Sequence, residues 1–375
     1  MKEGWEKYSL MDICNVTTGK HDANHAEING KYRFYTCSSQ YVYCNTKRYE
    51  GECIILPGNG INVGESYYYN GEFDAYQRTY VIDKIDKRII PMYLFYHLQN
   101  NWKSEGVAKQ YGSATNYIKI GNFKDYIVKM PQSLSEQQSI VDYLDSAFAK
   151  IGAMKANAEK ALNEAKALFQ ASLKEMLEPK EGWEEKNLGD ICEIIRGKRF
   201  VRTDIIENGV PCIHYGDIYT HYGLSVKKTR GCINPELAKK MRFAEKNDVV
   251  VVQAGENNWD IGVGVAYFGE EPAAVHDACF ILKHKQNPMY ISYYLRSYNY
   301  HRYLVDYVHE GKICSFLKPA LENAPIPLPP FSEQQSIVET LDSLKSKVDR
   351  LQANYDKISQ ECDALKQAIL RQVFE

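Results

Sequence analysis

A run of seven residues, Ser-Glu-Gln-Gln-Ser-Ile-Val, occurs twice in the chain, at residues 135–141 and again at 332–338. A second run, Lys-Glu-Gly-Trp-Glu, occurs at residues 2–6 and 180–184. Matches of this length at both places in each half are improbable by chance, so the sequence predicts two tandem copies of one unit. The length of 375 residues agrees with that division, since single hydrophobic cores stop growing at about 250–300 residues.

Each Ser-Glu-Gln-Gln run is predicted to open a long helix. Ser135 and Ser332 are expected as N-cap residues, because a serine oxygen can accept a hydrogen bond from a backbone N–H of the first turn. Gln138 and Gln335, three positions later, complete a capping-box pattern.

Apolar residues then recur in alternating steps of three and four, the spacing of a coiled-coil seam. In the second helix the seam comprises Leu341, Leu344, Val348, Leu351, Tyr355, Ile358, Cys362, Leu365 and Ile369. In the first helix it comprises Val141, Leu144, Phe148, Ile151, Ala158, Leu162, Ala165, Phe169 and Met176, interrupted by Lys155 and Ser172. The ends of a domain usually lie close together, so the first helix should finish where the second begins and the pair should run antiparallel.

The segments before the helices are rich in tyrosine, β-branched residues and glycine turns, which favours short strands. Strands are predicted at residues 32–36, 53–56, 76–82, 211–213, 248–252 and 279–282, and helices at 91–101 and 288–295. The predicted fold class is therefore α+β: two strand-rich mixed α/β domains separated by two long helices in an antiparallel coiled coil, related by a pseudo-two-fold axis. The predicted boundaries are 1–134 and 179–331 for the domains, and 135–178 and 332–375 for the helices.

Charge and cysteine content exclude several classes of protein. The net charge is −2, with no basic or acidic tail. The ten cysteines form no Cys-x-x-Cys pair and have no histidine cluster beside them, so we expect free thiols in a reducing cytosol and no metal site. No stretch approaches the roughly 20 apolar residues of a membrane span, and the amino terminus has no apolar signal region, so a cytoplasmic protein with no membrane partner is expected.

The sequence shows no pattern of residues typical of catalysis. It has no Asn-Pro-Pro-aromatic loop of an amino-methyltransferase and no phosphate-binding Gly-x-x-x-x-Gly-Lys run. The glycine pairs at 58–60 and 262–264 are interpreted as turns, because neither extends to Gly-x-Gly-x-x-Gly. His276 and Asp277 beside Cys279 are interpreted as a packed strand end.

The Gly-Trp-Glu starts, the Pro-Leu-Pro-Pro-Phe-Ser-Glu-Gln-Gln-Ser-Ile-Val run at 327–338 and its weaker partner at 131–141 resemble the specificity subunit of type I restriction-modification enzymes. The resemblance covers essentially the whole chain. The first exit departs from it, since Pro131-Gln-Ser-Leu replaces a proline-rich run.

This resemblance implies that each globular domain is a target recognition domain that reads one half of a bipartite, asymmetric site on double-stranded DNA. It implies that the helices set the distance between the half-sites and dock two methyltransferase subunits, with motor-nuclease subunits completing the complex. No cofactor is expected in this chain, whereas the partner subunits are expected to use S-adenosylmethionine, ATP and Mg.

DNA contacts require Lys and Arg at phosphates and polar side chains at base edges. The candidates in the first half are Lys20, Asn59, Asn62, Lys109, Gln110, Tyr111, Ser113, Asn116 and Lys119. The candidates in the second half are Lys198, Arg199, Lys227, Lys228, Arg230, Lys239, Lys240, Arg242, Asn257, Asn258, Lys312 and Lys318. Lys20 and Lys198 form the one basic pair that the repeat itself places at equivalent positions.

Two other classes of function remain open. The chain could itself carry nuclease or methylase activity, although the motifs of such enzymes are absent. It could also be a coiled-coil scaffold that binds protein without reading DNA, which would leave the two unlike domains without a purpose.

Overall fold

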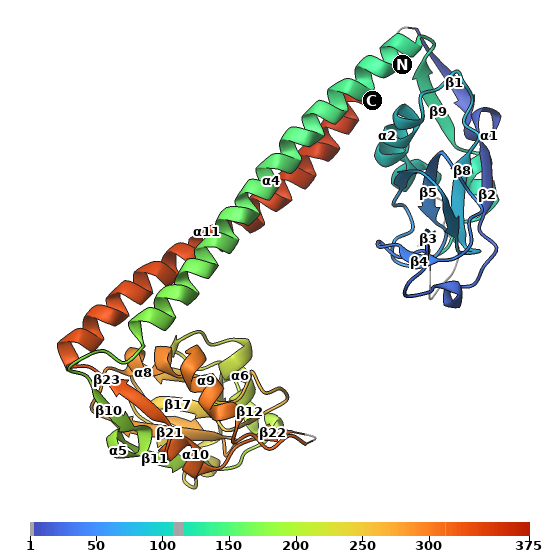
Figure 1. Ribbon diagram of the computed structural model, residues 1–375. Helices are drawn as coiled ribbons and strands as arrows, with labels where there is room; N and C mark the ends of the chain where they lie inside the picture. Colours follow the sequence, from blue (N-terminus) through green and yellow to red (C-terminus); the bar gives the residue numbers. More distant parts are fainter. Residues whose placement is uncertain (1–3, 108–110, 112–115, 312) are drawn as a thin grey trace. The chain divides into compact units, whose positions relative to one another are not determined.

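The computed structural model describes residues 4–107, 111, 116–311 and 313–375 (Figure 1). The chain divides into two compact units, Met1–Glu159 with Asn354–Glu375, and Lys160–Ala353. We call them unit 1 and unit 2. Each unit contains one globular part together with portions of two long helices, α4 (Leu134–Met176) and α11 (Phe331–Phe374). The predicted α+β class, with two strand-rich parts and two long helices, is confirmed.

Unit 1 is built on an antiparallel sheet of four strands in the order β2-β8-β5-β6. Their bounds are Asn15–Thr18, Thr79–Asp83, Glu52–Pro57 and Tyr67–Asn70. A smaller sheet has the order β4-β3-β7, with bounds Val42–Cys44, Tyr32–Tyr35 and Phe73–Ala75. Helix α2 (Pro91–Asn101) lies against β5 and β6, and the short helices are α1 (Leu10–Ile13), η1 (Ala23–His25), the π-helix η2 (Trp102–Gly106) and α3 (Ile120–Lys124). Strand β1 (Trp5–Ser9) pairs antiparallel with β9 (Ile127–Pro131), which leads into α4.

Unit 2 repeats this plan with a larger second sheet. Its main sheet has the order β11-β21-β17-β19-β14, with bounds Cys192–Arg196, Cys279–His284, Val249–Val252, Gly264–Tyr267 and Ser225–Val226. The second sheet has the order β12-β15-β13-β20-β16, with bounds Ile205–Ile206, Gly231–Ile233, Val210–Ile213, Ala273–Val275 and Phe243–Ala244. Strand β10 (Glu184–Asn187) pairs with β23 (Pro325–Leu328), and β18 (Ala254–Gly255) with β22 (Cys314–Ser315). The helices are α5 (Leu188–Ile191), η3 (Arg202–Asp204), α6 (Tyr215–Thr220), α7 (Pro235–Ala238), α8 (Pro288–Tyr294), α9 (Tyr298–Val305) and α10 (Lys318–Glu322).

The predicted strands and helices of the globular parts are found with one informative shift. The helix predicted over residues 91–101 is α2, and that over 288–295 is α8 with its last residue outside. The strand predicted over residues 76–82 begins only at Thr79, because residues 76–78 form a turn in which the N–H of Thr79 donates to the carbonyl of Tyr76 at 2.8 Å.

The long helices run antiparallel in each unit. In unit 1 the Cys362 Sγ lies 3.8 Å from the carbonyl oxygen of Ile151, and in unit 2 the Lys166 Nζ donates to Oε1 of Gln352 at 2.8 Å. Leu144 of α4 shares a core with Leu370 of α11 in unit 1. Increasing residue numbers on α4 therefore face decreasing numbers on α11, as the seam predicts.

One position of the predicted seam is wrong. Leu365 is 46% exposed, while Leu370 and Phe374 are buried at the end of α11. The ring of Phe374 packs against Tyr93 and His97 of α2, with centroid distances of 5.4 Å to each. The last turns of α11 thus bury apolar side chains against the globular part of unit 1 as well as against α4, and this second contact moves the buried face away from Leu365.

The predicted helix caps are also wrong. Helices α4 and α11 begin at Leu134 and Phe331, so Ser135 and Ser332 lie within the first turn. In unit 1 the cap is Ser133, whose Oγ accepts from the N–H of Glu136 at 3.3 Å. Gln138 donates to Asp142 one turn along the same helix instead of closing a capping box. The helices that follow strands β9 and β23 begin two residues earlier than the serine pattern predicts.

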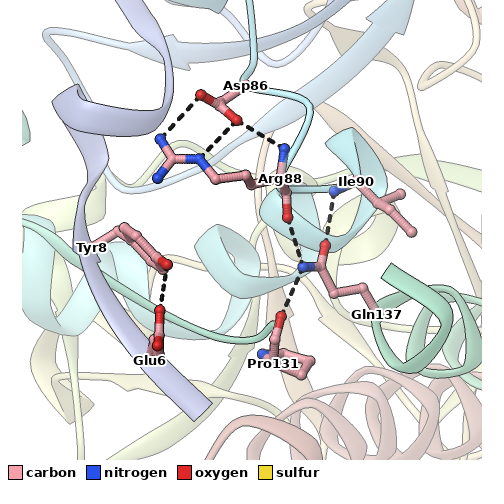
Figure 2. Close-up of polar contacts among 7 residues, drawn as sticks. All are labelled: Glu6, Tyr8, Asp86, Arg88, Ile90, Pro131 and Gln137. Atoms are coloured by element: carbon pink, nitrogen blue, oxygen red, sulfur yellow. Dashed lines mark hydrogen bonds and ion pairs between the residues drawn. The ribbon is translucent and has the colours of Figure 1, made fainter. Parts of the chain in front are cut away.

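The first glutamine of each repeated run fixes the start of its helix to the globular part, as Figure 2 shows for unit 1. Gln137 is fully buried; its Oε1 accepts from the N–H of Ile90 at 2.9 Å, and its Nε2 donates to the carbonyls of Arg88 and Pro131, both at 2.9 Å. Arg88 is itself held by Asp86, with Nε 2.9 Å from Oδ1.

Unit 2 repeats this arrangement at Gln334. Its Oε1 accepts from the N–H of Asn287 at 3.0 Å, and its Nε2 donates to Gln286 and to the carbonyl of Pro329. Asn287 is the N-cap of α8. The glutamine therefore joins the first turn of a long helix to the start of a domain helix in each unit.

The repeated tryptophan and glutamate form a second joint. The Trp5 indole donates to Oε1 of Glu136 at 3.2 Å, and the Trp183 indole donates to Oε2 of Glu333 at 3.1 Å. Residues of the two repeated sequence runs thus hold each long helix to its domain.

All ten cysteines are free thiols, as predicted. Burial raises the pKa of the Cys192 thiol to about 12, so it is protonated at neutral pH. Among the described residues, no helix combines the length and the apolar character needed to cross a membrane.

Candidate nucleic-acid interface

The repeated Gly-Lys pair stands at the same end of the main sheet in both units. A Cβ on Gly19 would lie 1.7 Å from the carbonyl oxygen of Ala75, and one on Gly197 would lie 2.2 Å from that of His276. Only glycine permits this approach of two backbones. Lys20 and Lys198 follow directly and are exposed, so close packing presents a lysine at one edge of each domain.

In unit 1, four segments meet at this end: residues 19–22, 58–62, 76–78, and residue 111 with residues 116–119. We call them loop cluster 1. Strands β2 and β5 finish here and β8 begins here, with Pro57 paired to Thr79 and Thr18 to Tyr80. The N–H of Gly58 donates to the carbonyl of Arg78 at 2.9 Å, and that of Ile118 donates to Gly58 at 2.9 Å. Backbone hydrogen bonds thus join segments that are far apart in the sequence.

Several of the predicted DNA contacts come together in loop cluster 1. Asn59 and Tyr117 form an isolated antiparallel β-bridge, and the N–H of Gly60 donates to the carbonyl of Asn116 at 2.8 Å. Tyr111 and Tyr117 exchange two backbone hydrogen bonds. Lys119 is exposed, with its Nζ 4.3 Å from the centroid of the Tyr111 ring. This contact holds the lysine charge over an aromatic surface at the rim of the loops.

Arg78 is a further candidate for DNA contact that the sequence pattern did not predict. It lies in the turn before β8, it is exposed, and it stands beside the loop that carries Asn59. Residues 76–78 correspond to residues 276–278 of unit 2, since Tyr76 donates to Tyr35 at 2.9 Å as His276 donates to Ile213 at 3.1 Å. The sequence signal for a strand over 76–82 hid this turn. Asn62 is less available than expected, because its amide donates to the carbonyl of Cys37 at 2.8 Å.

Unit 2 has the same frame with different side chains. Loop cluster 2 consists of residues 197–202, 253–260, 276–278 and 309–317, with 312 outside the described residues. The N–H of Gln253 donates to Ala278 at 2.8 Å and that of Phe316 donates to Gln253 at 3.3 Å, as Gly58 and Ile118 do in unit 1. Asn257 and Asn258 lie in the loop that corresponds to 59–62, and the Trp259 side chain between them and α9 is 79% exposed. The two loop clusters therefore share their backbone hydrogen bonds but differ in their exposed side chains.

A hollow of about 430 Å³ opens in loop cluster 2, lined by Arg199, Arg202, His214, Tyr215, Tyr219, Glu256, His276 and others. Burial, followed by the charge of His276, lowers the pKa of His214 to about 4, and burial also lowers the pKa of His276. Both imidazoles are therefore neutral at pH 7. Each Nδ1 accepts a backbone N–H, from Gly216 at 3.2 Å and from Ala278 at 3.0 Å, which leaves the proton on Nε2 as a donor. Arg199 and Arg202 are the cations of the lining, and Glu256 and Asp277 carry an equal formal negative charge.

The remaining candidates do not join the loop clusters as one surface. Lys227, Lys228 and Arg230 line another hollow with Glu207, Glu270 and Glu271. Lys239 pairs with Glu236 at 2.8 Å, and Lys318 pairs with Glu322 at 2.9 Å. Lys240 follows α7 and is exposed, while Arg242 lies beside cluster 2 through its contact with the carbonyl of Arg196 at 2.6 Å. Lys109, Gln110, Ser113 and Lys312 lie outside the described residues.

The pattern at His276, Asp277 and Cys279 is a packed strand end. Cys279 is fully buried in β21, and burial raises the pKa of its thiol far above the usual value. A thiol with so high a pKa is not a nucleophile at neutral pH.

Comparisons with known proteins point to one family. The model of the type I restriction modification DNA specificity domain matches residues 2–164 and 180–360. The type I restriction enzyme EcoDI specificity subunit of Escherichia coli is 35% identical over 169 residues, which is 45% of this chain and 37% of that protein, so the match spans well under half of the relative. The MjaVIII specificity subunit of Methanocaldococcus jannaschii is 24% identical over 378 residues, covering 92% of this chain and 87% of the relative.

Solved structures agree on the fold. A chain from a study of complex assembly and conformational transition of the type I R-M system superposes with a TM-score of 0.74 at 19% identity, covering 100% of this chain and 98% of that one. The HsdS subunit of Thermoanaerobacter tengcongensis gives a TM-score of 0.56 at 19% identity, covering 100% and 97%. On the family match to both halves of the repeat, this chain belongs to the type I restriction-modification DNA specificity family.

Proposed function

We propose that this chain is the sequence-specific DNA-binding subunit of a type I restriction-modification complex, and that each loop cluster reads one half of a bipartite, asymmetric site. The observation that carries the proposal is the repeated frame with unlike side chains. Both clusters are joined by equivalent backbone hydrogen bonds. Both clusters present a lysine at the equivalent positions Lys20 and Lys198. Cluster 1 adds Arg78 and Lys119, whereas cluster 2 adds Arg199, Arg202 and the neutral imidazole of His276.

The chemistry of the two clusters suits DNA in two ways. Exposed lysine and arginine side chains can contact phosphates, which supplies affinity without sequence preference. Asparagine amides carry both donors and acceptors, and the neutral histidines of unit 2 carry Nε2–H donors, while base edges present both kinds of group. Two clusters with different donors and acceptors should select two different half-sites.

In this proposal the chain has no catalytic role of its own. Two methyltransferase subunits and the motor-nuclease subunits would carry the chemistry with S-adenosylmethionine, ATP and Mg, and helices α4 and α11 would dock them and set the gap between half-sites. The buried, unreactive Cys279 supports a structural reading of the one Cys–His pattern in the sequence.

The decisive experiment exchanges residues 20–130 for the corresponding segment of a relative with a known site, and maps methylated positions in a host that carries the partner subunits. We expect one half of the methylated sequence to change and the other to stay. The reciprocal exchange within unit 2 is the matched control and should change the opposite half. A scaffold without DNA readout would retard no duplex even with the methyltransferase present, and a catalytic chain would methylate DNA alone; either result would overturn the proposal.

A further inference from the structure

Two histidines and an aspartate converge beside loop cluster 1. The ligand atoms of His21, His25 and Asp74 all lie within 4.8 Å of one another. His25 is the last residue of η1 and His21 lies four residues before it, while Asp74 comes from β7. The two imidazole rings are stacked, with centroids 3.8 Å apart and planes 7° from parallel.

Asp74 is the unusual member, because its side chain is 1% exposed. Its Oδ1 accepts from the N–H of Ala75 at 2.8 Å, and its Oδ2 accepts from the Thr46 hydroxyl at 2.7 Å. Within the described part of the chain its one ion-pair partner is His21, at 3.6 Å from Nε2 to Oδ2. Buried carboxylates in proteins are ordinarily paired with a cation or coordinate a metal ion.

We propose that His21, His25 and Asp74 bind one divalent transition-metal ion, with Zn²⁺ as the best fit. Imidazole nitrogen and carboxylate oxygen are ligands that Zn²⁺ takes at about 2.0–2.2 Å, and three protein ligands leave a fourth position for water. That position faces solvent, since the His21 side chain is 39% exposed.

The hydrogen bonds around Asp74 prepare it for this role. The Ala75 N–H holds Oδ1, so the carboxylate is oriented with Oδ2 toward the histidines, as partners of a metal ligand usually do. Binding requires the rings to tilt, because one ion cannot lie in the planes of two stacked, nearly parallel rings whose centroids are 3.8 Å apart. The Nε2 of His25 lies 2.8 Å from the Thr46 hydroxyl. His25 therefore binds the metal either through Nε2, which breaks this hydrogen bond, or through Nδ1, which keeps it.

The site is particular to unit 1. By the matched hydrogen bonds of the two frames, Asp74 corresponds to Ala274 and His21 corresponds to Arg199. It also reaches the candidate DNA surface, since the N–H of Gln77 donates to the carbonyl of His21 at 2.9 Å and Lys20 and Arg78 are the adjacent residues. A bound ion would tie the 19–25 segment to β7 and hold these two cations in place. This inference is independent of the proposed function.

Zinc titration of the full chain, freed of metal by chelation and kept reduced, tests the proposal by calorimetry. We expect about one equivalent of Zn²⁺ to bind with a Kd of about 10 μM or tighter. His21→Ala should weaken binding at least about tenfold and abolish the rise in Tm with zinc. His221→Ala removes an exposed histidine of unit 2 and is the matched control, which should bind as the unchanged chain does.

Cobalt(II) offers a second readout, since its visible absorption reports ligands directly. We expect a spectrum of nitrogen and oxygen ligation that His21→Ala removes. Asp74→Asn should remove it too, and if that variant fails to fold, His21→Ala remains decisive because its side chain is partly exposed. No saturable binding, or equal affinity for His21→Ala and His221→Ala, would overturn the proposal.

Discussion

The Oε1 of Gln137 accepts a hydrogen bond from the backbone N–H of Ile90 at 2.9 Å, across 47 residues of sequence. Ile90 is the N-cap of α2, and Gln137 lies in the first turn of α4. Gln334 and Asn287 repeat this pair at 3.0 Å in unit 2 (compare Figure 2 for unit 1). One buried amide thus fixes the direction in which each long helix leaves its domain.

Replacing Gln137 or Gln334 with alanine should destabilise the unit concerned by about 1–3 kcal/mol, because buried partners of the amide lose their hydrogen bonds. Urea denaturation and hydrogen exchange at the start of α2 and α8 measure the effect. Gln138→Ala and Gln335→Ala are matched controls on the exposed face of the same turn and should change stability by less than about 0.5 kcal/mol. Equal effects at both positions would contradict the role of the buried amide.

Arg78→Ala and Lys119→Ala should each weaken binding of the complex to DNA of any sequence, because a phosphate contact is lost. The slope of log K against log salt should fall by about 1 for each. Binding isotherms at several salt concentrations measure both quantities. Lys87→Ala is the control, since Lys87 is exposed beyond the opposite end of β8 and should leave the slope unchanged.

Deleting residues 161–167 of α4 together with 347–353 of α11 should shorten the gap between the two half-sites. These heptads face each other in the register set by Lys166 and Gln352, so the seam rejoins in phase. Seven residues of helix span about 10.5 Å, the rise of about three base pairs. Methylation mapping should find a gap shorter by that number. Deleting one heptad alone breaks the register of the two helices and should instead lower stability. An unchanged gap after the paired deletion would show that the helices do not set the distance between the half-sites.

Acid should destabilise unit 1 through His97. Burial, followed by the charge of Lys129, lowers the pKa of His97 to about 3, and its Nε2 accepts from the N–H of Lys129 at 3.2 Å while Nδ1 lies 3.0 Å from the Tyr126 hydroxyl. Below pH 6.5 the unfolded chain therefore binds a proton at His97 that the folded chain does not bind. The free energy of unfolding falls by about 1.4 kcal/mol per pH unit as the pH drops from 6.5 toward 3.

Hydrogen exchange of peptides from α2 between pH 7 and pH 5 measures this loss, after correction for the intrinsic exchange rate. His97→Gln should show lower stability at pH 7 and a shallower dependence on pH. A dependence equally steep in the variant would assign the acid effect to other groups.

Sequence patterns that are local in the chain anticipated much of the fold. The heptad spacing of apolar residues specified two long helices, since only one face of a helix is buried against its partner. The repeated runs specified two homologous units. Proline before an apolar helical pattern placed α2 and α8 to within one residue.

The tertiary structure alone decided which residues of those patterns carry the contacts. Ser135 is a residue type that commonly caps helices, yet the helix begins before it and Ser133 is the cap. Arg78, His25 and Asp74 gain their surroundings from segments far along the chain. Hydrogen bonds between such segments depend on where the strands end in space, and periodicity along the chain does not encode that.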